Sequence, residues 1–446
     1  MRKVRYRNRR RKFLTIFIVI LLAALTAVAG YAALIYNRDN NRSSGDKDIG
    51  LNTPSHQNDT AATSIVTPTP TSTPANTSQE PVQEEDNLKE QIIGMSLDEK
   101  IGQMVIVGLD GYTVDEQARQ MIEEYNVGGF ILFKSNIQNS NQMLELLNSL
   151  KSENRVNKIP LFLSVDEEGG RVSRLPDEFI KIPSNKTIGK LNNSSVSYQV
   201  GSIIGEELKS FGMNMDFAPV LDINSNPKNP VIGDRSFGTA PDLVSKLGVQ
   251  TMKGLQSQNI IPVVKHFPGH GDTSTDSHVG LPRVNNDLKR LRSFELRPFQ
   301  DAIENGAEAV MVAHILLPKI DPKNPASFSK TIISDILRTE MNYDGVVITD
   351  DFTMGAIVKN YNIGQAAVKS IVAGSDIVLV CHDFEKQKTV ISALKNAAES
   401  GRLPMDRIDQ SVTRILKLKQ EHKITDEPAN AVDPKPINDK IRALLK

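Results

Sequence analysis

The chain has 446 residues, and its 53 basic and 53 acidic side chains give a formal net charge of zero at neutral pH. Eight of the basic residues lie within the first twelve positions, so the remaining 434 residues carry a net charge of −8. A mildly acidic body argues against a nucleic-acid-binding surface, which needs a positive field. Cys381 is the only cysteine, which excludes an intrachain disulfide and a cysteine-rich zinc site.

Residues 13–36 form an uncharged, apolar run of 24 residues. As a helix this run would be about 36 Å long, enough to cross a hydrocarbon core of about 30 Å. The basic residues 1–12 predict a cytoplasmic stub before this helix and an extracytoplasmic body after it. A cleaved signal peptide is the alternative, because residues 27–29 read Ala-Val-Ala, but the run is longer than the roughly 7–15 apolar residues of such a signal. We therefore predict a single-pass membrane anchor, with a secreted protein if the segment is cleaved.

Residues 37–86 are rich in Thr, Ser, Pro and Asn and include TPTPTSTP at 67–74. Such a composition buries too little apolar surface to offset the loss of chain entropy, so we predict a disordered, extended linker. Order is expected to begin near residue 87. Shortly afterwards, Ser96 and Glu99 have the spacing of a capping box, which predicts the start of a helix.

From residue 87 onward, short apolar runs alternate with stretches of helical sequence. The eight runs are 104–108, 128–133, 161–165, 215–221, 262–265, 309–313, 345–349 and 376–380, and helical stretches include 139–153, 195–210, 286–305 and 385–400. Continuous Val- and Ile-rich runs are typical of parallel strands buried on both faces. Eight such units predict a (β/α)₈ TIM-type barrel, a single catalytic domain over residues 87–425. An open doubly wound sheet is the alternative, although no G-x-G-x-x-G follows the first run. Residues 426–446 are predicted to be a tail with a short helix at 437–445.

In a barrel of this kind, catalytic groups are expected just after the strands, at their C-terminal ends. Polar residues follow four of the runs in this way. They are DEEGGR from Asp166, KHFPGHGDTSTDSH from Lys265 to His278, His314, and the pair Asp350-Asp351. This pattern predicts a site at one rim of the barrel.

The segment after the fifth run contains three of the chain's seven histidines. His266 and His270 are four residues apart, but Pro268 and the neighbouring glycines prevent the helix that such a zinc motif needs. A metal site of another geometry, and a glycine-rich loop whose polar residues only satisfy its own backbone, remain alternatives. The third interpretation is an acid/base unit, in which Asp276 orients His278 two residues later.

The carboxylates after the third and seventh runs each allow two interpretations. Neighbouring side chains of a strand face opposite ways, so only one of Asp350 and Asp351 can point into the barrel mouth, and the run before them is compatible with either. A carboxylate at that position could bind a ligand or act as a nucleophile. Asp166 is followed by Arg171 and Arg174, so a simple ion pair and a ligand contact are both open.

Taken together, these segments resemble a known family. KHFPGHGDTSTDSH is similar to the signature of family 3 glycoside hydrolases of the bacterial β-N-acetylglucosaminidase branch. MSLDEKIGQM, VDEEGGRVSRL, FAPVLDI, IGDRSFG and DGVVITDDFTMGAI resemble the other blocks of that family, in order, over residues 90–420. The resemblance implies that Asp350 is the nucleophile, that His278 is the general acid/base and that Asp276 is its partner. The residues that it implies for holding the sugar in the −1 pocket are Asp166, Arg174, Arg235, Lys265 and His266.

The resemblance implies a retaining exo-β-N-acetylglucosaminidase that forms a covalent glycosyl-enzyme intermediate, with neither a cofactor nor a metal. A histidine can serve as the acid/base near neutral pH, because its ordinary pKa is near 6.5. The expected partners are a carbohydrate containing N-acetylglucosamine and, through the N-terminal helix, the membrane; no nucleic acid is expected. Because the anchor holds the site near a wall layer, cell-wall glycan fragments are the expected substrates. A β-glucosidase or another β-glycosidase on the same barrel, and an inactive wall-binding scaffold, are the alternatives.

One position departs from the family pattern. Glu167 stands where many relatives carry Gln, which adds a negative charge beside Asp166 and is expected to alter either the pKa of Asp166 or the sugar contacts. For Cys381 and His382, which follow the eighth run, we expect a structural role.

Overall fold

The computed structural model describes residues 80–445. The predicted stub and anchor and residues 37–79 of the predicted linker lie outside the described residues. Over residues 80–445, no helix combines the length and the apolar character that a membrane span requires. Helix α2 (Glu80–Ile93) starts before residue 87, so the end of the predicted linker is helical. Its sequence carries a proline in the first turn and an excess of acidic residues, both of which suit the N-terminal end of a helix.

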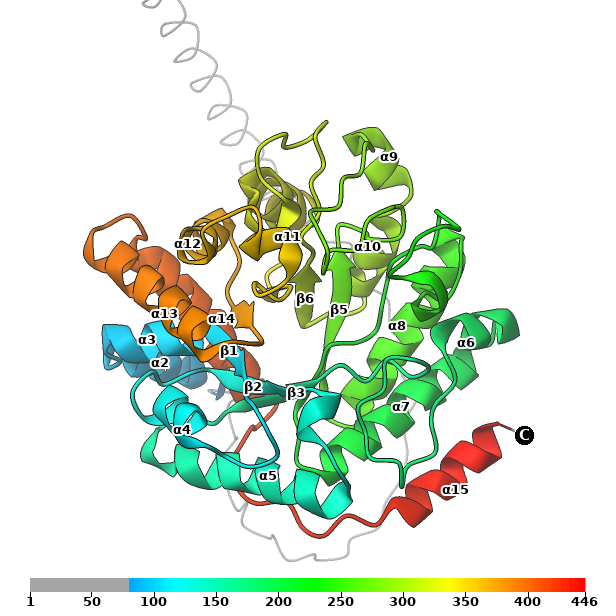
Figure 1. Ribbon diagram of the computed structural model, residues 1–446, viewed down its shortest axis with the longest axis horizontal. Coiled ribbons are helices and arrows are strands. Elements are labelled where there is room, and N and C mark those ends of the chain that lie inside the picture. The colour runs from blue at the N-terminus through cyan, green and yellow to red at the C-terminus, as the bar shows by residue number, and fades with distance from the viewer. Residues whose placement is uncertain (1–79, 446) are drawn as a thin grey trace, which may run out of the picture. The chain divides into compact units, whose positions relative to one another are not determined.

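All eight predicted strands are present and form one parallel sheet. They are β1 (Val105–Gly108), β2 (Gly129–Leu132), β3 (Phe162–Val165), β4 (Met215–Asp216), β5 (Ile261–Phe267), β6 (Ala309–Val312), β7 (Val346–Thr349) and β8 (Val378–Val380). Neighbours in the sheet follow one another in sequence from β1 to β7, and β8 pairs with β1. A single parallel bridge between Ile348 and Ile377 joins the two edges, so the sheet is a nearly closed barrel surrounded by helices (Figure 1). The open doubly wound alternative, which reverses the strand order, is therefore wrong.

Strands β4 and β5 differ most from their predicted bounds. Only Met215 and Asp216 pair with β5 as a regular strand, whereas we predicted strand as far as residue 221. Pro219 interrupts the ladder because a proline has no N–H to donate. The pairing resumes at Val220, which bridges Lys265, and the Leu221 N–H donates to the Lys265 carbonyl at 2.6 Å. This contact holds the end of β5 beside the segment that follows β4.

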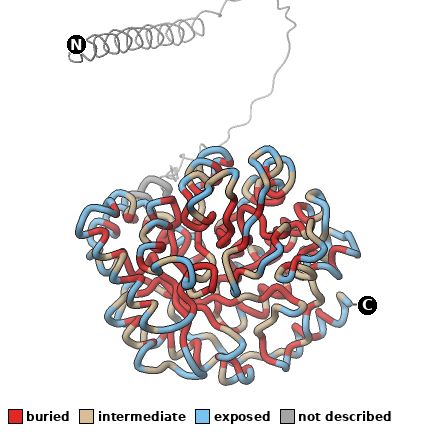
Figure 2. Tube along the Cα trace, turned by 45° about the horizontal axis from the view of Figure 1, so that its top comes forward, coloured by how far each residue is buried: buried red, intermediate tan, exposed pale blue. Residues whose placement is uncertain are grey.

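The helices form the outer layer of the barrel. Before the middle of the chain these are α3 (Leu97–Gln103), α4 (Glu116–Glu123), α5 (Ser140–Glu153), α6 (Asn185–Leu191), α7 (Ser194–Ser210) and α8 (Pro241–Ser257). After it come α9 (Leu288–Ser293), α10 (Arg297–Glu304), a π-helix (Thr331–Glu340), α11 (Gly355–Val358), α12 (Ile363–Ala373), α13 (Phe384–Glu399), α14 (Met405–Glu421) and α15 (Pro434–Leu444). The side chains of the strands are buried throughout, and exposed residues lie on the outer helices and loops (Figure 2).

Three helix predictions can be compared with these bounds. The capping box is confirmed, since Ser96 and Glu99 each accept the other's backbone N–H. The single helix predicted at 286–305 is wrong, because the chain breaks between α9 and α10, where Pro298 suits the start of a new helix. The helix in the predicted tail is confirmed but begins earlier, at Pro434. It packs on α7 beside the barrel (Figure 1).

Candidate active site

A pocket of about 480 Å³ opens at the C-terminal ends of the barrel strands. Every predicted catalytic and sugar-binding residue lines it, although these residues come from four separate segments of the chain. They are Asp166, Arg174, Arg235, Lys265, His266, Asp276, His278 and Asp350. The strands bring them together because the carboxyl ends of parallel barrel strands meet at one rim.

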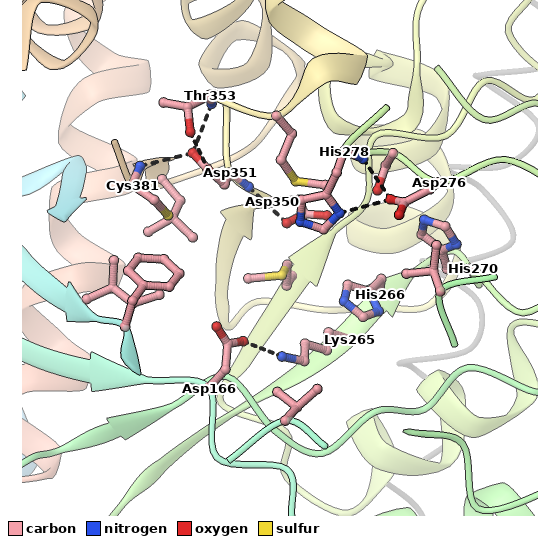
Figure 3. A pocket seen from close by; sticks show the side chains of 18 of the residues that line it. Asp166, Lys265, His266, His270, Asp276, His278, Asp350, Asp351, Thr353 and Cys381 are labelled. Carbon is pink, nitrogen blue, oxygen red and sulfur yellow. Dashed lines mark hydrogen bonds and ion pairs between the residues drawn. The ribbon is translucent and has the colours of Figure 1, made fainter. Parts of the chain in front are cut away.

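Asp350 and Asp351 follow β7 and take different directions. The Asp351 carboxylate accepts the N–H groups of Cys381 and Thr353, both at 2.9 Å, and the Thr353 hydroxyl at 2.5 Å. These bonds tie the end of β7 to the end of β8. Asp350 instead extends toward the side of the pocket where His278 and Asp276 lie (Figure 3). Of the two carboxylates, Asp350 is therefore the one that is free to react with a bound molecule.

The surroundings of Asp350 keep its carboxylate ionised. Burial by itself raises the pKa of this carboxyl, but the nearby imidazoles of His314 and His266 outweigh the burial and hold the pKa below its usual value. The Asp351 N–H also donates to Asp350 Oδ1 at 2.9 Å. A nucleophilic carboxylate has to be deprotonated, and this environment supplies that condition.

Asp276 and His278 form a hydrogen-bonded pair on the loop after β5. Asp276 Oδ1 lies 2.9 Å from His278 Nδ1 and accepts the His278 backbone N–H at 2.8 Å. Burial raises the pKa of Asp276, but the bonds from His278 more than offset it and hold the pKa below its usual value. With Nδ1 bonded to the carboxylate, Nε2 is the ring nitrogen left for proton transfer. The His278 side chain is 68% exposed, so it can reach a bound molecule in the pocket mouth.

Two cations and two anions form a compact cluster at the base of the pocket. Lys265 Nζ lies 2.5 Å from Asp166 Oδ1 and 2.8 Å from Glu168 Oε1. The Arg235 guanidinium binds both oxygens of Glu168, at 2.7 and 2.8 Å. Burial lowers the pKa of Lys265, but Asp166 and Glu168 reverse the effect and raise it, so Lys265 stays charged. Fixed charged groups of this kind can hold the hydroxyls of a sugar without reorganising.

Known proteins match the part of the chain that forms this site. The family model "Glycosyl hydrolase family 3 N terminal domain" matches residues 96–418, most of the described chain. The chain belongs to glycoside hydrolase family 3.

Relatives in this family carry consistent names. The chain is 36% identical over 331 residues to the beta-hexosaminidase A of Pseudoalteromonas piscicida, which covers 69% of this chain but only 55% of that relative. It is 34% identical over 326 residues to the beta-hexosaminidase of Nitrosomonas eutropha, covering 71% of this chain and 92% of the relative. The chain thus spans just over half of the first of these proteins and nearly all of the second.

Solved structures similar to this chain carry related names. The family 3 beta-N-acetylglucosaminidase from Paenibacillus sp. FPU-7 superposes with a TM-score of 0.75 at 41% identity, covering 78% of this chain and 68% of that one. The beta-N-acetylhexosaminidase from Beutenbergia cavernae superposes with a TM-score of 0.69 at 28% identity, covering 73% of this chain and 99% of that one. The barrel described above is therefore the N-terminal domain of family 3.

Several residues of this family 3 site were not predicted. Asp222 Oδ2 lies 2.7 Å from His266 Nδ1 and orients that ring, and Glu168 bridges Lys265 and Arg235. They stand in the segments FAPVLDI and DEEGGR; Asp222 directly follows a predicted strand, and Glu168 is the third residue after one. Their position after a strand is the signal that could have identified them. Asp166 pairs with Lys265 rather than with Arg171, which pairs with Asp234.

His270 is a further unpredicted residue of the pocket. Its Nδ1 lies 2.8 Å from the Thr273 hydroxyl, while its Nε2 is buried and has no hydrogen-bond partner among residues 80–445. Burial, with a contribution from His266, lowers the pKa of His270 to about 4, so the ring is neutral near neutral pH. Over the same residues, no three side chains of His, Cys, Asp or Glu converge as metal ligands.

Glu167 does not line the pocket, so of the two effects expected of it, a direct change in the sugar contacts is not supported. Its side chain is buried behind the site, and Oε2 accepts the N–H groups of Arg174 at 2.7 Å and Leu175 at 3.3 Å. Burial raises the pKa of Glu167 to about 7. The side chain thus holds the backbone of the segment that carries Arg174. The physical reason is that Glu167 follows Asp166 directly, and neighbouring side chains at a strand end face opposite ways.

Residues 381 and 382 also lie at the pocket. Cys381 is buried, and its backbone N–H donates to Asp351. Burial raises the pKa of its thiol well above the usual value, so the thiol is not a nucleophile at neutral pH. The exposed His382 ring packs on Phe133 with a centroid separation of 4.7 Å. Both residues line the pocket, Cys381 holding Asp351 through its backbone and His382 packing through its ring on Phe133.

A pH dependence of stability follows from a second buried carboxyl behind the pocket. Burial, together with the charges of Glu167 and Asp216, raises the pKa of Glu207 well above 4.5. The folded chain therefore keeps a proton that the unfolded chain releases above about pH 5, so stability falls as the pH rises from there toward the folded-state pKa. We expect Glu207→Gln to reduce the fall in melting temperature between pH 5 and pH 8. Glu145→Gln, at an exposed position on α5, is the control and should leave the fall unchanged. An equal fall in wild type and Glu207→Gln would contradict the assignment.

Proposed function

We propose that the chain is a retaining exo-β-N-acetylglucosaminidase that removes a terminal β-linked N-acetylglucosamine. The observation that carries the proposal is the presence, in one pocket, of an ionised carboxylate at Asp350 and a hydrogen-bonded Asp276–His278 pair. The names of the family 3 relatives and neighbouring structures support the choice of sugar.

Hydrolysis then proceeds in two displacements. Asp350 attacks the anomeric carbon while His278 gives a proton to the glycosidic oxygen, so the aglycone leaves as a neutral alcohol and the sugar becomes an ester of Asp350. His278 next takes a proton from a water molecule. The oxygen of this water attacks the anomeric carbon from the face that the aglycone left, opposite Asp350, and displaces the Asp350 carboxylate. Two inversions at one carbon give net retention. Asp276 stabilises the imidazolium and holds its Nδ1.

The charged cluster and its neighbours bind the terminal sugar. Asp166, Lys265 and Arg235 present fixed donors and acceptors, and Arg174 and His266 complete the −1 pocket. Arg171 links the segments after β3 and β4, because it donates to the Ile232 carbonyl at 3.2 Å and pairs with Asp234 at 2.9 Å. This link closes one side of the pocket, which favours a chain end over an internal sugar.

A panel of nitrophenyl β-glycosides tests the proposal. We expect turnover of the N-acetylglucosaminide to exceed that of the glucoside by at least about 10²-fold, because a site built to hold a polar group rejects an analogue that lacks it. Proton NMR of the first-formed sugar should show the β-anomer. Turnover by wild type and none by Asp350→Ala would exclude a contaminating hydrolase. Preference for the glucoside would instead support a β-glucosidase, and no turnover of any glycoside would support a wall-binding scaffold.

We also propose that residues 13–36 anchor the protein in the membrane with the barrel outside the cytoplasm, where cell-wall glycan fragments are the substrates. The length of the apolar run and the basic residues before it support this placement. Cell fractionation tests it, since an anchored protein stays with the membranes, whereas a soluble mature form beginning near residue 30 would show that the segment is cleaved.

A further inference from the structure

The loop that carries Asp276 and His278 is attached to the barrel at its two ends. At one end, Thr273 bonds to His270 and to Asn229. At the other, the Val284 N–H donates to the Leu316 carbonyl at 3.0 Å and the Leu316 N–H donates to the Pro282 carbonyl at 2.9 Å, so residues 282–284 pair with the segment after β6. Between these ends, the His278 side chain and Val279 are 68% and 64% exposed. The attachments at the two ends therefore do not by themselves fix the position of His278 relative to Asp350.

The middle of this loop rests on α11, the short helix that begins five residues after Asp350. The Ala356 N–H donates to the Ser277 carbonyl at 2.9 Å. Lys359 Nζ, at the end of α11, donates to the Val279 carbonyl at 2.8 Å. Two of three consecutive loop carbonyls are thus bound by donors from one turn of helix.

The third carbonyl, that of His278 itself, lies against Gly355. A Cβ built on Gly355 would stand 2.3 Å from the His278 oxygen, a separation that real Cβ atoms do not show. A glycine is therefore required at this position for the two backbones to approach so closely. The turn beneath the loop is also fixed from within, because Val279 and Gly280 both donate to the Asp276 carbonyl at 3.0 Å.

We propose that α11 supports the loop that carries the acid/base pair, and that Gly355 and Lys359 are positioning residues. Through the backbone of this loop they set the distance from His278 to the bound substrate. This inference rests on the proposed function. Because Asp350 follows β7 and α11 begins only five residues later, one short segment carries the nucleophile and, through these carbonyl contacts, holds the proton donor. Proton transfer needs a heavy-atom approach of about 2.6–3.2 Å, so a small displacement of the loop should weaken acid catalysis while leaving the sugar pocket intact.

The test of Lys359 uses aryl β-N-acetylglucosaminides that differ only in the acidity of the phenol. In Lys359→Met, we expect kcat/KM to fall about tenfold for the least acidic phenols and to change little for dinitrophenol, which needs no proton. The dependence of rate on phenol acidity should therefore become steeper. Lys359→Arg, which keeps a donor, should restore most of the loss.

Lys246→Met is the matched control. Lys246 is also an exposed lysine whose Nζ donates to a backbone carbonyl, that of Asn192 at 3.2 Å, but on α8 away from the pocket. It should leave the dependence on phenol acidity unchanged. An equal loss for every phenol in Lys359→Met, or no loss at all, would overturn the proposal while leaving the proposed function standing. An inactive wild type would overturn both.

Gly355→Ala provides a second, stronger perturbation. The added methyl group must push the His278 backbone away, and displacements of about 1 Å in an active site can cost about 10²-fold in rate. We expect that loss for poor leaving groups, with azide accelerating turnover of the dinitrophenyl substrate. Gly94→Ala, whose Cβ would make only ordinary contacts at 3.5 Å, is the control for the glycine change. If Gly355→Ala does not fold, the Lys359 series still decides the question.

Discussion

Asp350→Ala is expected to lower kcat by about 10⁴-fold or more, with a melting temperature close to that of wild type. The loss should be large because removal of a nucleophile leaves only binding and electrostatic effects. Stability should change little, because the Asp350 carboxylate accepts only the N–H of its neighbour Asp351, and no other hydrogen bond reaches it among the described residues. Steady-state kinetics and a thermal melt of the same preparation check both parts.

Asp351→Asn is the matched control for this experiment. The Asp351 carboxylate accepts three hydrogen bonds that join the ends of β7 and β8. The amide oxygen can keep the two N–H bonds, but the amide nitrogen cannot accept the Thr353 hydroxyl, and all of the bonds lose the charge of the carboxylate, a loss of about 1–3 kcal/mol. We therefore expect a clear fall in melting temperature and a smaller loss of activity, the reverse of the pattern for Asp350→Ala. The opposite result would exchange the roles of the two residues.

The anomer formed in the presence of azide identifies the missing group. Without Asp350, azide can enter the vacated space on the α-face and give the α-glycosyl azide in one inversion. A fluorinated substrate that traps the intermediate should label the peptide containing Asp350 in wild type. A label on any other carboxylate would contradict the assignment.

The barrel could be predicted from the sequence because its signals are local. Each strand is a short Val- and Ile-rich run, and each parallel neighbour needs only the intervening helix. The exceptions also have local causes. Pro219 cuts β4 short, and the break between α9 and α10 places Glu295, which is buried and bonded to Arg290, between two helical stretches. Pro298, in the first turn of α10, marks the start of the second helix.

The sequence could predict which residues line the site, but not how they contact one another. The positions after the strands and the Asp276–His278 spacing indicated the candidate carboxylates and histidine, whereas Arg174 and Arg235 came from the resemblance to family 3. Pairings between distant segments could not be predicted, because nothing in the local sequence says that Glu168 reaches both Lys265 and Arg235. Alternation at the strand end implies that Asp166 and Glu167 face opposite ways, but it does not say which of the two enters the pocket. Such details become visible only when the strands are placed in register.

Asp276→Asn tests whether the Asp276–His278 pair takes part in catalysis. If Asp276 fixes the tautomer and the charge of His278, the amide should slow hydrolysis of a natural glycan by about 10²–10⁴-fold, the usual contribution of a general acid/base. With an activated nitrophenyl aglycone, glycosylation needs little protonation, so the loss in that step should be far smaller. The ratio of the two losses, measured as kcat/KM, reports the proton transfer itself.

His278→Ala should expose the second half of the cycle. With a nitrophenyl substrate, the glycosyl-enzyme forms but water is no longer activated, so we expect a burst of nitrophenol equal to the enzyme concentration. Azide needs no base, so it should relieve the slow step and yield the β-glycosyl azide, the opposite anomer to that expected from Asp350→Ala. Because the His278 side chain is 68% exposed, its removal should cost little stability.

His382→Ala separates catalysis from a general effect on the pocket. His382 is another exposed histidine at the pocket, and its ring packs on Phe133. Any loss of kcat/KM in His382→Ala should be equal for the natural and the nitrophenyl aglycone, and no burst of nitrophenol should appear. If the loop after β5 only satisfied its own backbone, His278→Ala would behave in the same way and would also lower the melting temperature. Equal losses without a burst in His278→Ala would therefore move the acid/base role to another residue. His270 would be the first to examine, since its neutral ring lines the same pocket with Nε2 unpaired among the described residues.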